Sequence, residues 1–550
     1  MQIFRNMRVS MRDGVNLSTN VFLPDGIGPW PVVLVRTAYN RNFVYDSSFP
    51  RSEMALVVQD CRGRYASEGE YYPFVNETND GYDTLEWISS QAWCNGKIGM
   101  YGASYLAATQ FYAAISGSKK ISVLNPQFMA EDCWKQAYFS NGAFSLGLTW
   151  SWLCFETNSK TSEASLMPAF NVGELLRTLP LIDLDIKSGA GSVKSYRDFV
   201  SNNVYCEFWK QFSLRDQYDK FQMPVLLTGG WYDYYPSEML KLFCELRKHS
   251  DTKQIADSHR IIIGPWTHGI NYSTTLGEID FGKDSLKEND ATIRWLDCIL
   301  HEKNASQFQS APIKIFVMGK NAWQDEYEWP PVRIRYTNYY LHSSGNIDTT
   351  PPGKDEKPDT YDYDPSNPVP TVGGNHSIGP YNPGLYELAK PGPYDQRVLE
   401  TRDDVMVYTG DILKHDIEIT GPIIFNLFAS SSAVDTDFVV KLADVYPDGR
   451  SINISEGIIR ARFRNNVWGE PELIEPGRVY EFNVDMVATS NVFKKGHRIK
   501  IYLTSSSFPL WDRNLNTGNN PAYDTQMKIA HQTIFHDSLR PSHIVLPIAG

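Results

Sequence analysis

The stretch from Gly99 to Ile115, GMYGASYLAATQFYAAI, constrains the fold of this 550-residue chain more than any other. Ile98 to Tyr101 are apolar or small, as in a buried parallel strand, and the pattern breaks at Gly102-Ala103-Ser104-Tyr105. From Leu106 onward, small and apolar residues continue as in a buried helix. The sequence therefore predicts a strand, a sharp turn that contains a serine, and a helix.

A serine in such a turn has its hydroxyl lifted above the sheet, and the N–H of the next residue, Tyr105, can join an oxyanion hole. This arrangement is the nucleophile elbow of the α/β-hydrolases, and its usual pattern is G-x-S-x-G. Here Leu106 holds the last position and Ala107 follows, so there is no second glycine. On the motif alone, a serine in an ordinary strand-to-helix turn remains the alternative.

Apolar strands alternate with helical segments before the elbow. Val32 to Val35 and Ala55 to Val58 are typical of buried strands, and residues 79–90 carry apolar side chains at helical spacing. Such alternation predicts a mostly parallel sheet covered on both faces. Reactive groups gather at the carboxyl ends of the strands of such sheets. Tyr39 and Ser104 both directly follow a predicted strand.

The same sheet resumes after residue 221. Pro224 to Leu227 form a predicted strand that leads into Gly229-Gly230-Trp231-Tyr232-Asp233. Arg260 to Ile263 form another, which leads into Gly264-Pro265-Trp266-Thr267-His268. Two further polar side chains are therefore expected at the carboxyl edge of the sheet.

Ser104, Asp233 and His268 stand in the chain order nucleophile, acid, histidine, which is the order of the α/β-hydrolase triad. In that arrangement His268 takes the serine proton, and Asp233 orients the imidazole and stabilises the imidazolium. The alternatives are a structural histidine, and a turn aspartate that caps the helix opening at Pro236. The oxyanion donors are expected to be the Tyr105 N–H and the Tyr39 hydroxyl, although Tyr39 could also be an interface tyrosine.

Residues 127–221 are rich in Trp and Phe and lack strand alternation, so we expect a helical insertion. Its aromatic residues can form a small hydrophobic core or the inner face of a lid over a substrate pocket. The candidate pocket residues are Trp134, Trp150, Trp152, Tyr234 and Tyr235.

From about residue 311 the hydrophobic period becomes two, which predicts a β-sandwich of the jelly-roll type. Residues 349–396 are dense in Pro, Gly and Asp and are expected to form a long ordered crossing loop. The expected fold class is therefore α/β, with an α/β-hydrolase domain at 1–126 and 222–310, a helical cap at 127–221, and a jelly-roll domain at 311–550.

The net charge, the apolar runs and the cysteines of the chain limit the class of partner. The net charge of −12 argues against a nucleic-acid or anionic-membrane surface, and no apolar run reaches the length of a transmembrane helix. The N-terminal residues lack a signal peptide, and the seven cysteines have no CxxC spacing, as in a cytoplasmic protein with reduced thiols. No metal or cofactor motif is found. The oligomeric state stays open, with a homo-oligomer among the alternatives.

Several segments together resemble the cocaine-esterase-like (CocE/NonD) serine hydrolases, which are related to X-Pro dipeptidyl-peptidases and α-amino-acid ester hydrolases. These segments are RTAYNR (36–41), QDCRGRYASEG (59–69), NDGYDTLEWISSQAWCNGKIGMYGASY (79–105), GGWYD (229–233), GPWTH (264–268), YDYDPSNPVPTVGG (361–374), YPDGRSINISEGIIRARFR (446–464) and NVFKKGHRI (491–499). The resemblance spans nearly the whole chain. It implies the same three-domain architecture, with Ser104 as nucleophile, Asp233 as acid, His268 as base, and Tyr39 and Tyr105 as the oxyanion hole.

The chain departs from the family pattern at Ala38, where the family often has proline, and at Ala107, where it has glycine. Both are small, so we expect the elbow to form. The α-amino-acid ester hydrolases place acidic residues after the catalytic aspartate, whereas this chain has Tyr234, Tyr235 and Pro236, which speaks against that substrate class.

The leading hypothesis is a serine hydrolase that cleaves carboxylic esters of small acyl substrates, with amides as a further substrate class, through an acyl-serine intermediate on Ser104. One alternative is an amide-directed acylase or an X-Pro-type exopeptidase. A non-enzymatic alternative is a binding protein in which the jelly roll binds the ligand and the hydrolase domain is a vestigial scaffold.

Overall fold

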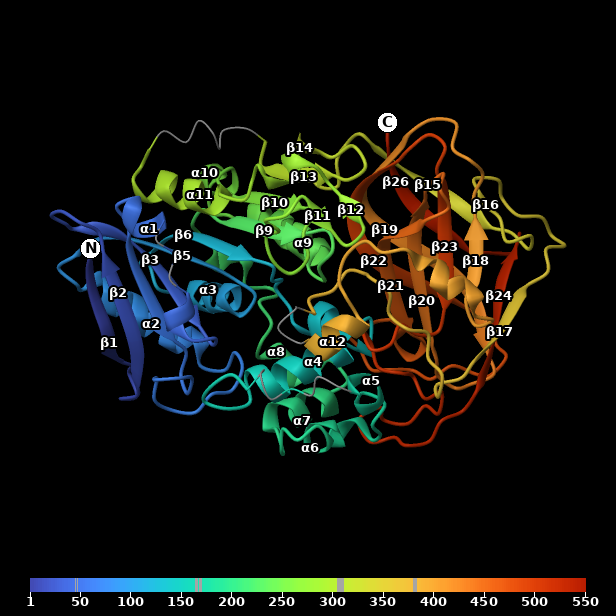
Figure 1. The fold of residues 1–550 in the computed structure, drawn as a ribbon, viewed down its shortest axis with the longest axis horizontal. Helices are drawn as coiled ribbons and strands as arrows, with labels where there is room; N and C mark the ends of the chain where they lie inside the picture. Colours follow the sequence, from blue (N-terminus) through green and yellow to red (C-terminus); the bar gives the residue numbers. More distant parts are fainter. Residues whose placement is uncertain (45, 47, 164–166, 168–170, 304–310, 379–382) are drawn as a thin grey trace.

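The computed structural model describes residues 1–550 apart from 45, 47, 164–166, 168–170, 304–310 and 379–382. A ten-stranded sheet forms the part of the molecule that contains the N-terminus, and an eight-stranded and a four-stranded antiparallel sheet form the part that contains the C-terminus. Short helices lie at the lower edge between these two parts in Figure 1.

The ten-stranded sheet has the order β1-β2-β4-β3-β5-β6-β9-β10-β13-β14, and its strands from β4 to β13 run parallel. The antiparallel strands β1, β2 and β14 form its edges. The bounds are β1 Gln2–Ser10, β2 Asn16–Leu23, β3 Trp30–Thr37, β4 Ala55–Asp60, β5 Cys94–Ala103, β6 Ile121–Gln127, β9 Leu226–Gly230, β10 Arg260–Gly264, β13 Ile313–Val317 and β14 Ala322–Glu326.

Helices cover both faces of this sheet, which explains why its inner strands carry apolar side chains on both faces. Along β3, Val32 and Leu34 belong to the core shared with α2, α3 and α9, whereas Val33 and Val35 belong to the core shared with α1 and α11. The bounds are α1 Ser48–Arg51, α2 Glu77–Ser89, α3 Tyr105–Ile115, α9 Pro236–Lys248, α10 Lys253–Ala256 and α11 Ala291–Leu300.

The ten-stranded sheet extends beyond the boundary that is expected at residue 310. Strand β13 pairs with β10, and β14 pairs with β13, so the catalytic sheet continues to residue 326. The segment 304–310 itself lies outside the described residues. The hydrophobic period of two begins near residue 311, and it is shared by the last strands of the ten-stranded sheet and by the strands of the C-terminal sheets. The period therefore could not separate one sheet from the next.

The segment between β6 and β9 consists mainly of short helices, and we refer to residues 128–225 as the cap. It also contains one small hairpin and two π-helical turns, Trp134–Tyr138 and Trp152–Glu156. Its other elements are β7 Phe139–Ser140, β8 Ala143–Phe144, α4 Leu146–Ser151, α5 Val172–Leu175, α6 Leu184–Lys187, α7 Lys194–Ser201 and α8 Glu207–Lys210.

The C-terminal part is a β-sandwich of the jelly-roll type with one eight-stranded and one four-stranded antiparallel sheet. The larger sheet contains β15 Ile334–Leu341, β16 Ile347–Asp348, β17 Asp359–Tyr363, β19 Ile417–Ser431, β22 Tyr480–Phe493, β24 Ala530–Asp537, β25 Arg540–Pro541 and β26 His543–Ala549. The smaller contains β18 Met406–Thr409, β20 Asp437–Val445, β21 Ser451–Arg460 and β23 Arg498–Thr504.

The crossing loop expected at 349–396 contains regular structure. Strand β17 pairs with β24 at the edge of the larger sheet, and helix α12, Pro383–Leu388, lies beside the cap (Figure 1). Residues 379–382 of this loop lie outside the described residues. The dense Pro and Gly composition of the loop concealed β17, which is short and lies at an edge.

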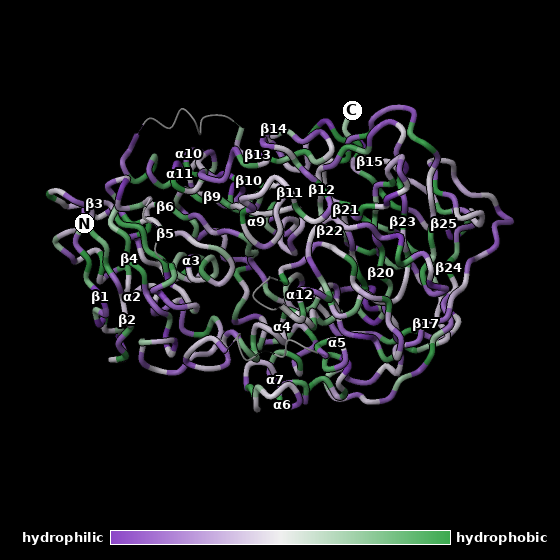
Figure 2. The backbone as a smooth tube through the Cα atoms, in the orientation of Figure 1, coloured by the Kyte–Doolittle hydropathy of each residue, from purple (hydrophilic) through white to green (hydrophobic). Residues whose placement is uncertain are grey.

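The hydropathy pattern follows this layering. Hydrophobic residues concentrate along the inner strands and α3, and hydrophilic residues along the outer loops (Figure 2). Within the part of the chain that the structure describes, no helix has the length and apolarity needed to cross a membrane.

Candidate active site

Ser104 occupies a sharp turn between β5 and α3. Its backbone has φ 58° and ψ −122°, a conformation that side-chain-bearing residues rarely adopt outside strained, functional positions. Gly102 precedes it at φ +144°, and a Cβ there would lie 2.4 Å from Cβ of Leu106, so only glycine fits. Tyr105 is the first residue of α3, and its N–H therefore has no acceptor within the helix.

Where the family pattern has its second glycine, this chain has Ala107, which is fully buried in the core around α3. The turn forms in its presence, because a methyl group is small enough for the helix to pack against the sheet. On the other side of the turn, the Ser104 N–H donates to the carbonyl of Gln127 in β6 at 2.9 Å.

Asp233 and His268 lie in the loops that follow the neighbouring strands β9 and β10. These loops are in direct backbone contact, since the Tyr232 N–H donates to the Trp266 carbonyl at 2.9 Å. Gly230 permits the approach, because a Cβ there would lie 2.3 Å from that same carbonyl oxygen. The glycine at the end of β9 therefore brings the two loops together.

The two side chains form a hydrogen-bonded pair. His268 Nδ1 lies 3.1 Å from each carboxylate oxygen of Asp233, which is fully buried. The Tyr234 N–H also donates to Asp233 Oδ1, at 2.8 Å, and so fixes the carboxylate. A carboxylate only accepts hydrogen bonds, so His268 carries its proton on Nδ1, and Nε2 is left as a basic nitrogen.

Ser104 and His268 line one pocket at the carboxyl edge of the sheet. The full set of lining residues is Tyr39, Phe74, Ser104, Tyr105, Met129, Tyr138, Leu148, Trp152, Tyr235, His268 and Ser377. Within the described residues no hydrogen bond joins Ser104 to His268. Such bonds are often long in free enzymes and tighten when substrate binds.

Tyr39 follows β3 and faces this pocket. Its hydroxyl oxygen accepts the indole N–H of Trp152 at 2.9 Å, which leaves the phenolic hydrogen for another acceptor. Burial raises the pKa of Tyr39, with the charge of Glu156 adding to the effect, so the phenol stays protonated at neutral pH. Tyr39 and the N–H of Tyr105 are thus two hydrogen-bond donors beside Ser104.

The predicted pocket residues divide into two groups. Trp152 and Tyr235 line the pocket, whereas Trp134, Trp150 and Tyr234 do not. Trp134 is fully buried in the aromatic core of the cap, where its ring stacks on Phe139 at 4.3 Å.

Trp150 is also fully buried, and its ring packs against Phe155 at 5.4 Å. Tyr234 turns to a neighbouring small cavity that Asn375 and Trp511 also line. For Trp134 and Trp150 the core interpretation of the cap aromatics holds. The aromatic content alone did not reveal which side of the cap each ring occupies.

Sequence reasoning missed Phe74, Met129, Tyr138, Leu148 and Ser377. Tyr138 and Trp152 both lie in π-helical turns, which are rare and frequent at functional sites, but no sequence signal marks them. Phe74 has φ 72°, and Ser377 comes from a loop of the C-terminal part, more than a hundred residues from His268. Contacts made by such loops carry no local periodicity.

No group of three or more His, Cys, Asp or Glu side chains among the described residues is arranged to hold a metal ion. The chemistry that this arrangement offers is that of a hydroxyl beside a basic imidazole, with two donors aimed at one pocket.

Comparison with known proteins gives two family matches that cover most of the chain. Residues 13–270 match the family described as X-Pro dipeptidyl-peptidase (S15 family), and residues 306–545 match the X-Pro dipeptidyl-peptidase C-terminal non-catalytic domain. The chain is 36% identical to the cocaine esterase of Rhodococcus sp. (strain MB1 Bresler), over 99% of this chain and 98% of the relative.

Two solved structures share the fold over the full chain. An α-amino acid ester hydrolase, 24% identical, superimposes with a TM-score of 0.87 and is covered over 96% of its length. An aminopeptidase from the marine sediment archaeon Thaumarchaeota archaeon, also 24% identical, has a TM-score of 0.84 and is covered over 97%.

Proposed function

We propose that this chain, which belongs to the cocaine-esterase-like (CocE/NonD) family of serine hydrolases, acts on carboxylic esters and that Ser104 is its nucleophile. His268 is the general base and Asp233 holds it. The observation that carries this proposal is the single pocket that Ser104 and His268 share, with His268 Nδ1 at 3.1 Å from the buried Asp233.

In the first step the Ser104 hydroxyl oxygen attacks the ester carbonyl carbon while its proton passes to His268 Nε2. The carbonyl oxygen becomes an oxyanion, which the Tyr39 hydroxyl and the Tyr105 N–H stabilise. The C–O bond to the leaving group then breaks, and His268 gives its proton to the leaving alkoxide. The products are the free alcohol and an acyl ester on Ser104.

In the second step a water molecule attacks the acyl carbon and gives a proton to His268. The second tetrahedral intermediate collapses, the bond to Ser104 breaks, and the proton returns to the serine oxygen. The carboxylic acid leaves. Asp233 stays ionised throughout and stabilises the imidazolium of each step.

The substrate pocket supports small acyl groups with an apolar or aromatic character. Its walls are the side chains of Phe74, Met129, Leu148, Trp152 and Tyr235. Comparison favours esters over amides, because the relative that matches over nearly the full chain is named an esterase. The amide-directed and the non-enzymatic alternatives gain no comparable support.

Besides Ser104, His268 and the tyrosine hydroxyls, Ser377 places a polar side chain in this lining. The Ser377 hydroxyl is buried, and no hydrogen-bond partner for it lies among the described residues. A buried hydroxyl without a partner costs free energy until a ligand supplies one. Ser377 therefore supports a substrate that carries a hydroxyl or carbonyl group in addition to its ester.

The test of the nucleophile is labelling with a fluorophosphonate probe followed by peptide mapping. We expect one adduct, on Ser104, which is lost in Ser104→Ala and kept in Ser116→Ala at the other end of α3. An adduct elsewhere, or none, would refute the assignment and favour the binding-protein alternative. A panel of matched p-nitrophenyl esters and anilides tests the substrate class, and a strong anilide preference would overturn the ester preference.

A further inference from the structure

Glu77, the first residue of α2, lies beneath the turn that carries Ser104. It is 3% exposed, and its Oε1 accepts the phenolic O–H of Tyr105 at 2.8 Å. Tyr105 directly follows Ser104 in the chain. A buried carboxylate is thus hydrogen-bonded to the residue whose backbone N–H is proposed to stabilise the oxyanion.

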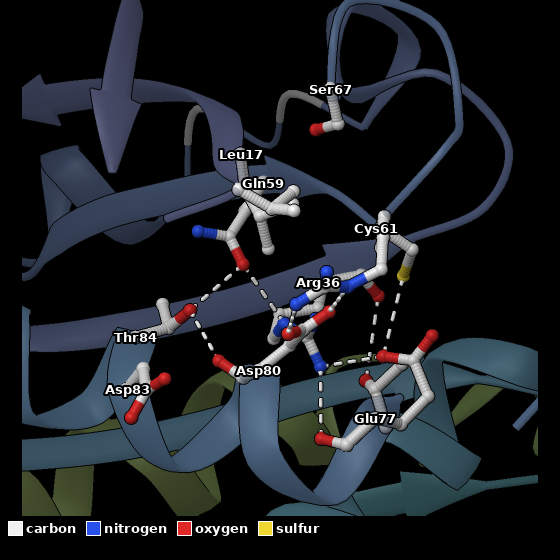
Figure 3. Close-up of polar contacts among 12 residues, drawn as sticks. Leu17, Arg36, Gln59, Cys61, Ser67, Glu77, Asp80, Asp83 and Thr84 are labelled. Carbon is white, nitrogen blue, oxygen red and sulfur yellow. Dashed lines mark hydrogen bonds and ion pairs between the residues drawn. The ribbon is translucent and has the colours of Figure 1, made fainter. Parts of the chain in front are cut away.

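A buried arginine neutralises this carboxylate. Arg36 Nη1 lies 2.6 Å from Glu77 Oε2 and also donates to the Glu77 carbonyl at 3.3 Å (Figure 3). Arg36 Nε donates to Gln59 Oε1 at 2.9 Å, and Arg36 is fully buried. The carboxylate therefore has a fixed position and a compensated charge, so it does not oppose negative charge that develops in the pocket above.

The Tyr105 phenol is held at a second point. Its oxygen accepts the Phe74 N–H at 3.1 Å, and the Phe74 ring stacks on the Tyr105 ring at 5.2 Å. With its hydrogen on Glu77 and its oxygen bonded to Phe74, the phenol is held by two hydrogen bonds. Its far end is anchored, so the Tyr105 backbone, from which the ring extends, is held in one orientation.

We propose that Glu77 is a positioning residue that acts through the Tyr105 side chain to aim the Tyr105 N–H at the oxyanion. The inference rests on the proposed role of that N–H. Preorganised donors stabilise an oxyanion without reorganising during the reaction, so a loosened donor lowers the rate of the chemical step. Substrate in its ground state makes no comparable demand, and its binding depends less on Glu77.

Asp80 provides a matched control on the same helix. It is 1% exposed and ion-paired like Glu77, with Arg62 Nη2 at 2.6 Å and Arg36 Nη2 at 3.8 Å. It makes no hydrogen bond to Tyr105 among the described contacts. If the network only supports folding, neutralising Asp80 and neutralising Glu77 should have the same effect on activity.

The test compares Glu77→Gln, Tyr105→Phe, the double variant and Asp80→Asn in the full-length chain. A glutamine at 77 turns its amide oxygen to Arg36, because that hydrogen bond is charge-assisted, and presents its nitrogen to the phenol. The phenolic hydrogen then loses its carboxylate acceptor. Steady-state kinetics with p-nitrophenyl butyrate give kcat and KM. Inhibition by phenylboronic acid measures how well the site binds a tetrahedral adduct on the serine, and thermal unfolding measures stability.

We expect Glu77→Gln and Tyr105→Phe each to lower kcat about tenfold with KM nearly unchanged, and phenylboronic acid to bind about tenfold more weakly. The double variant should be no slower than Tyr105→Phe, since both changes break one interaction. Asp80→Asn should unfold at a lower temperature and keep kcat within about twofold.

Additive losses in the double variant, an unchanged kcat in Tyr105→Phe, or an equal kcat loss in Asp80→Asn would each overturn the proposal. If Glu77→Gln does not fold, Tyr105→Phe still decides it, because that variant loses one hydroxyl alone. Failure of the proposed function is distinguishable, since wild-type protein would then take no fluorophosphonate on Ser104.

Discussion

The phenol of Tyr39 offers the most direct measurement of the oxyanion site. Tyr39→Phe removes one oxygen atom and leaves the ring, which packs edge-on against Tyr105 at 6.4 Å. That oxygen has two roles in the structure. It accepts the Trp152 indole N–H at 2.9 Å, and its hydrogen is proposed to donate to the oxyanion.

The two roles predict two separable losses. Removal of one donor from an oxyanion hole raises the activation barrier by about 3 kcal/mol, so kcat should fall roughly 100- to 1000-fold. The indole N–H of Trp152, a residue 8% exposed, would lose its partner, which should cost about 1–2 kcal/mol of unfolding free energy. KM should change little, because the ground-state carbonyl gains less from the donor than the oxyanion does.

The assay is steady-state hydrolysis of p-nitrophenyl butyrate, with active sites counted by fluorophosphonate labelling and stability measured by urea unfolding. Trp152→Phe is the control, since it removes the indole donor and keeps the Tyr39 hydroxyl. It leaves no unpaired indole N–H, and it should show a much smaller fall in kcat than Tyr39→Phe. A Tyr39→Phe protein that labels fully and retains more than a fifth of wild-type kcat would refute the donor role.

Three further predictions concern the base, the pocket and the pH dependence of stability. His268→Ala should lower kcat about as much as Ser104→Ala, because residues of a triad act as a unit; a His268→Ala protein with most of its activity would mean that the base is another residue. Ser377→Ala should reduce the kcat/KM preference for p-nitrophenyl 3-hydroxybutyrate over p-nitrophenyl butyrate by about tenfold, or reduce by as much the preference for an ester with a hydroxylated alcohol group over one with a plain alcohol group. An unchanged ratio in both substrate pairs would exclude a hydrogen bond from Ser377 to the substrate. His259 is buried, and burial, followed by the charges of Arg247 and Arg260, lowers its pKa to about 4. The unfolded chain binds this proton near pH 6.5, so stability should fall as the pH falls from about 6.5 to 4, by about 3 kcal/mol in all, and His259→Gln should flatten that part of a urea-midpoint titration.

The parts of the fold that follow local periodicity could be predicted from the sequence. The predicted strands at 32–35 and 55–58 lie within β3 and β4, and the sharp turn expected at Ser104 forms although Ala107 replaces a glycine. Asp233 and His268 lie at strand ends, where polar residues in an apolar context are conspicuous. For each of these, the signal lies within about ten residues.

The parts that depend on contact between distant segments could not be predicted. Trp150 and Trp152 are two residues apart, yet one fills the cap core and the other bonds to Tyr39, since α4 ends at Ser151 and a π-helical turn begins at Trp152. Ser377 reaches the pocket from the C-terminal part of the chain, and β13 joins the catalytic sheet despite its alternating pattern. Composition and periodicity do not encode which surfaces meet.

The cap is tied to the β-sandwich by main-chain and side-chain bonds. The Gly147 N–H donates to the Pro509 carbonyl at 3.0 Å, the Phe144 N–H to Asp512 at 2.8 Å, and the Asn141 amide to the Ile458 carbonyl at 2.9 Å. A shortened protein ending after β14 would keep Ser104, Asp233 and His268 in sequence but would leave these cap groups facing water. The β-sandwich contributes none of the three proposed triad residues, yet its contacts hold the cap over the pocket in which they would act.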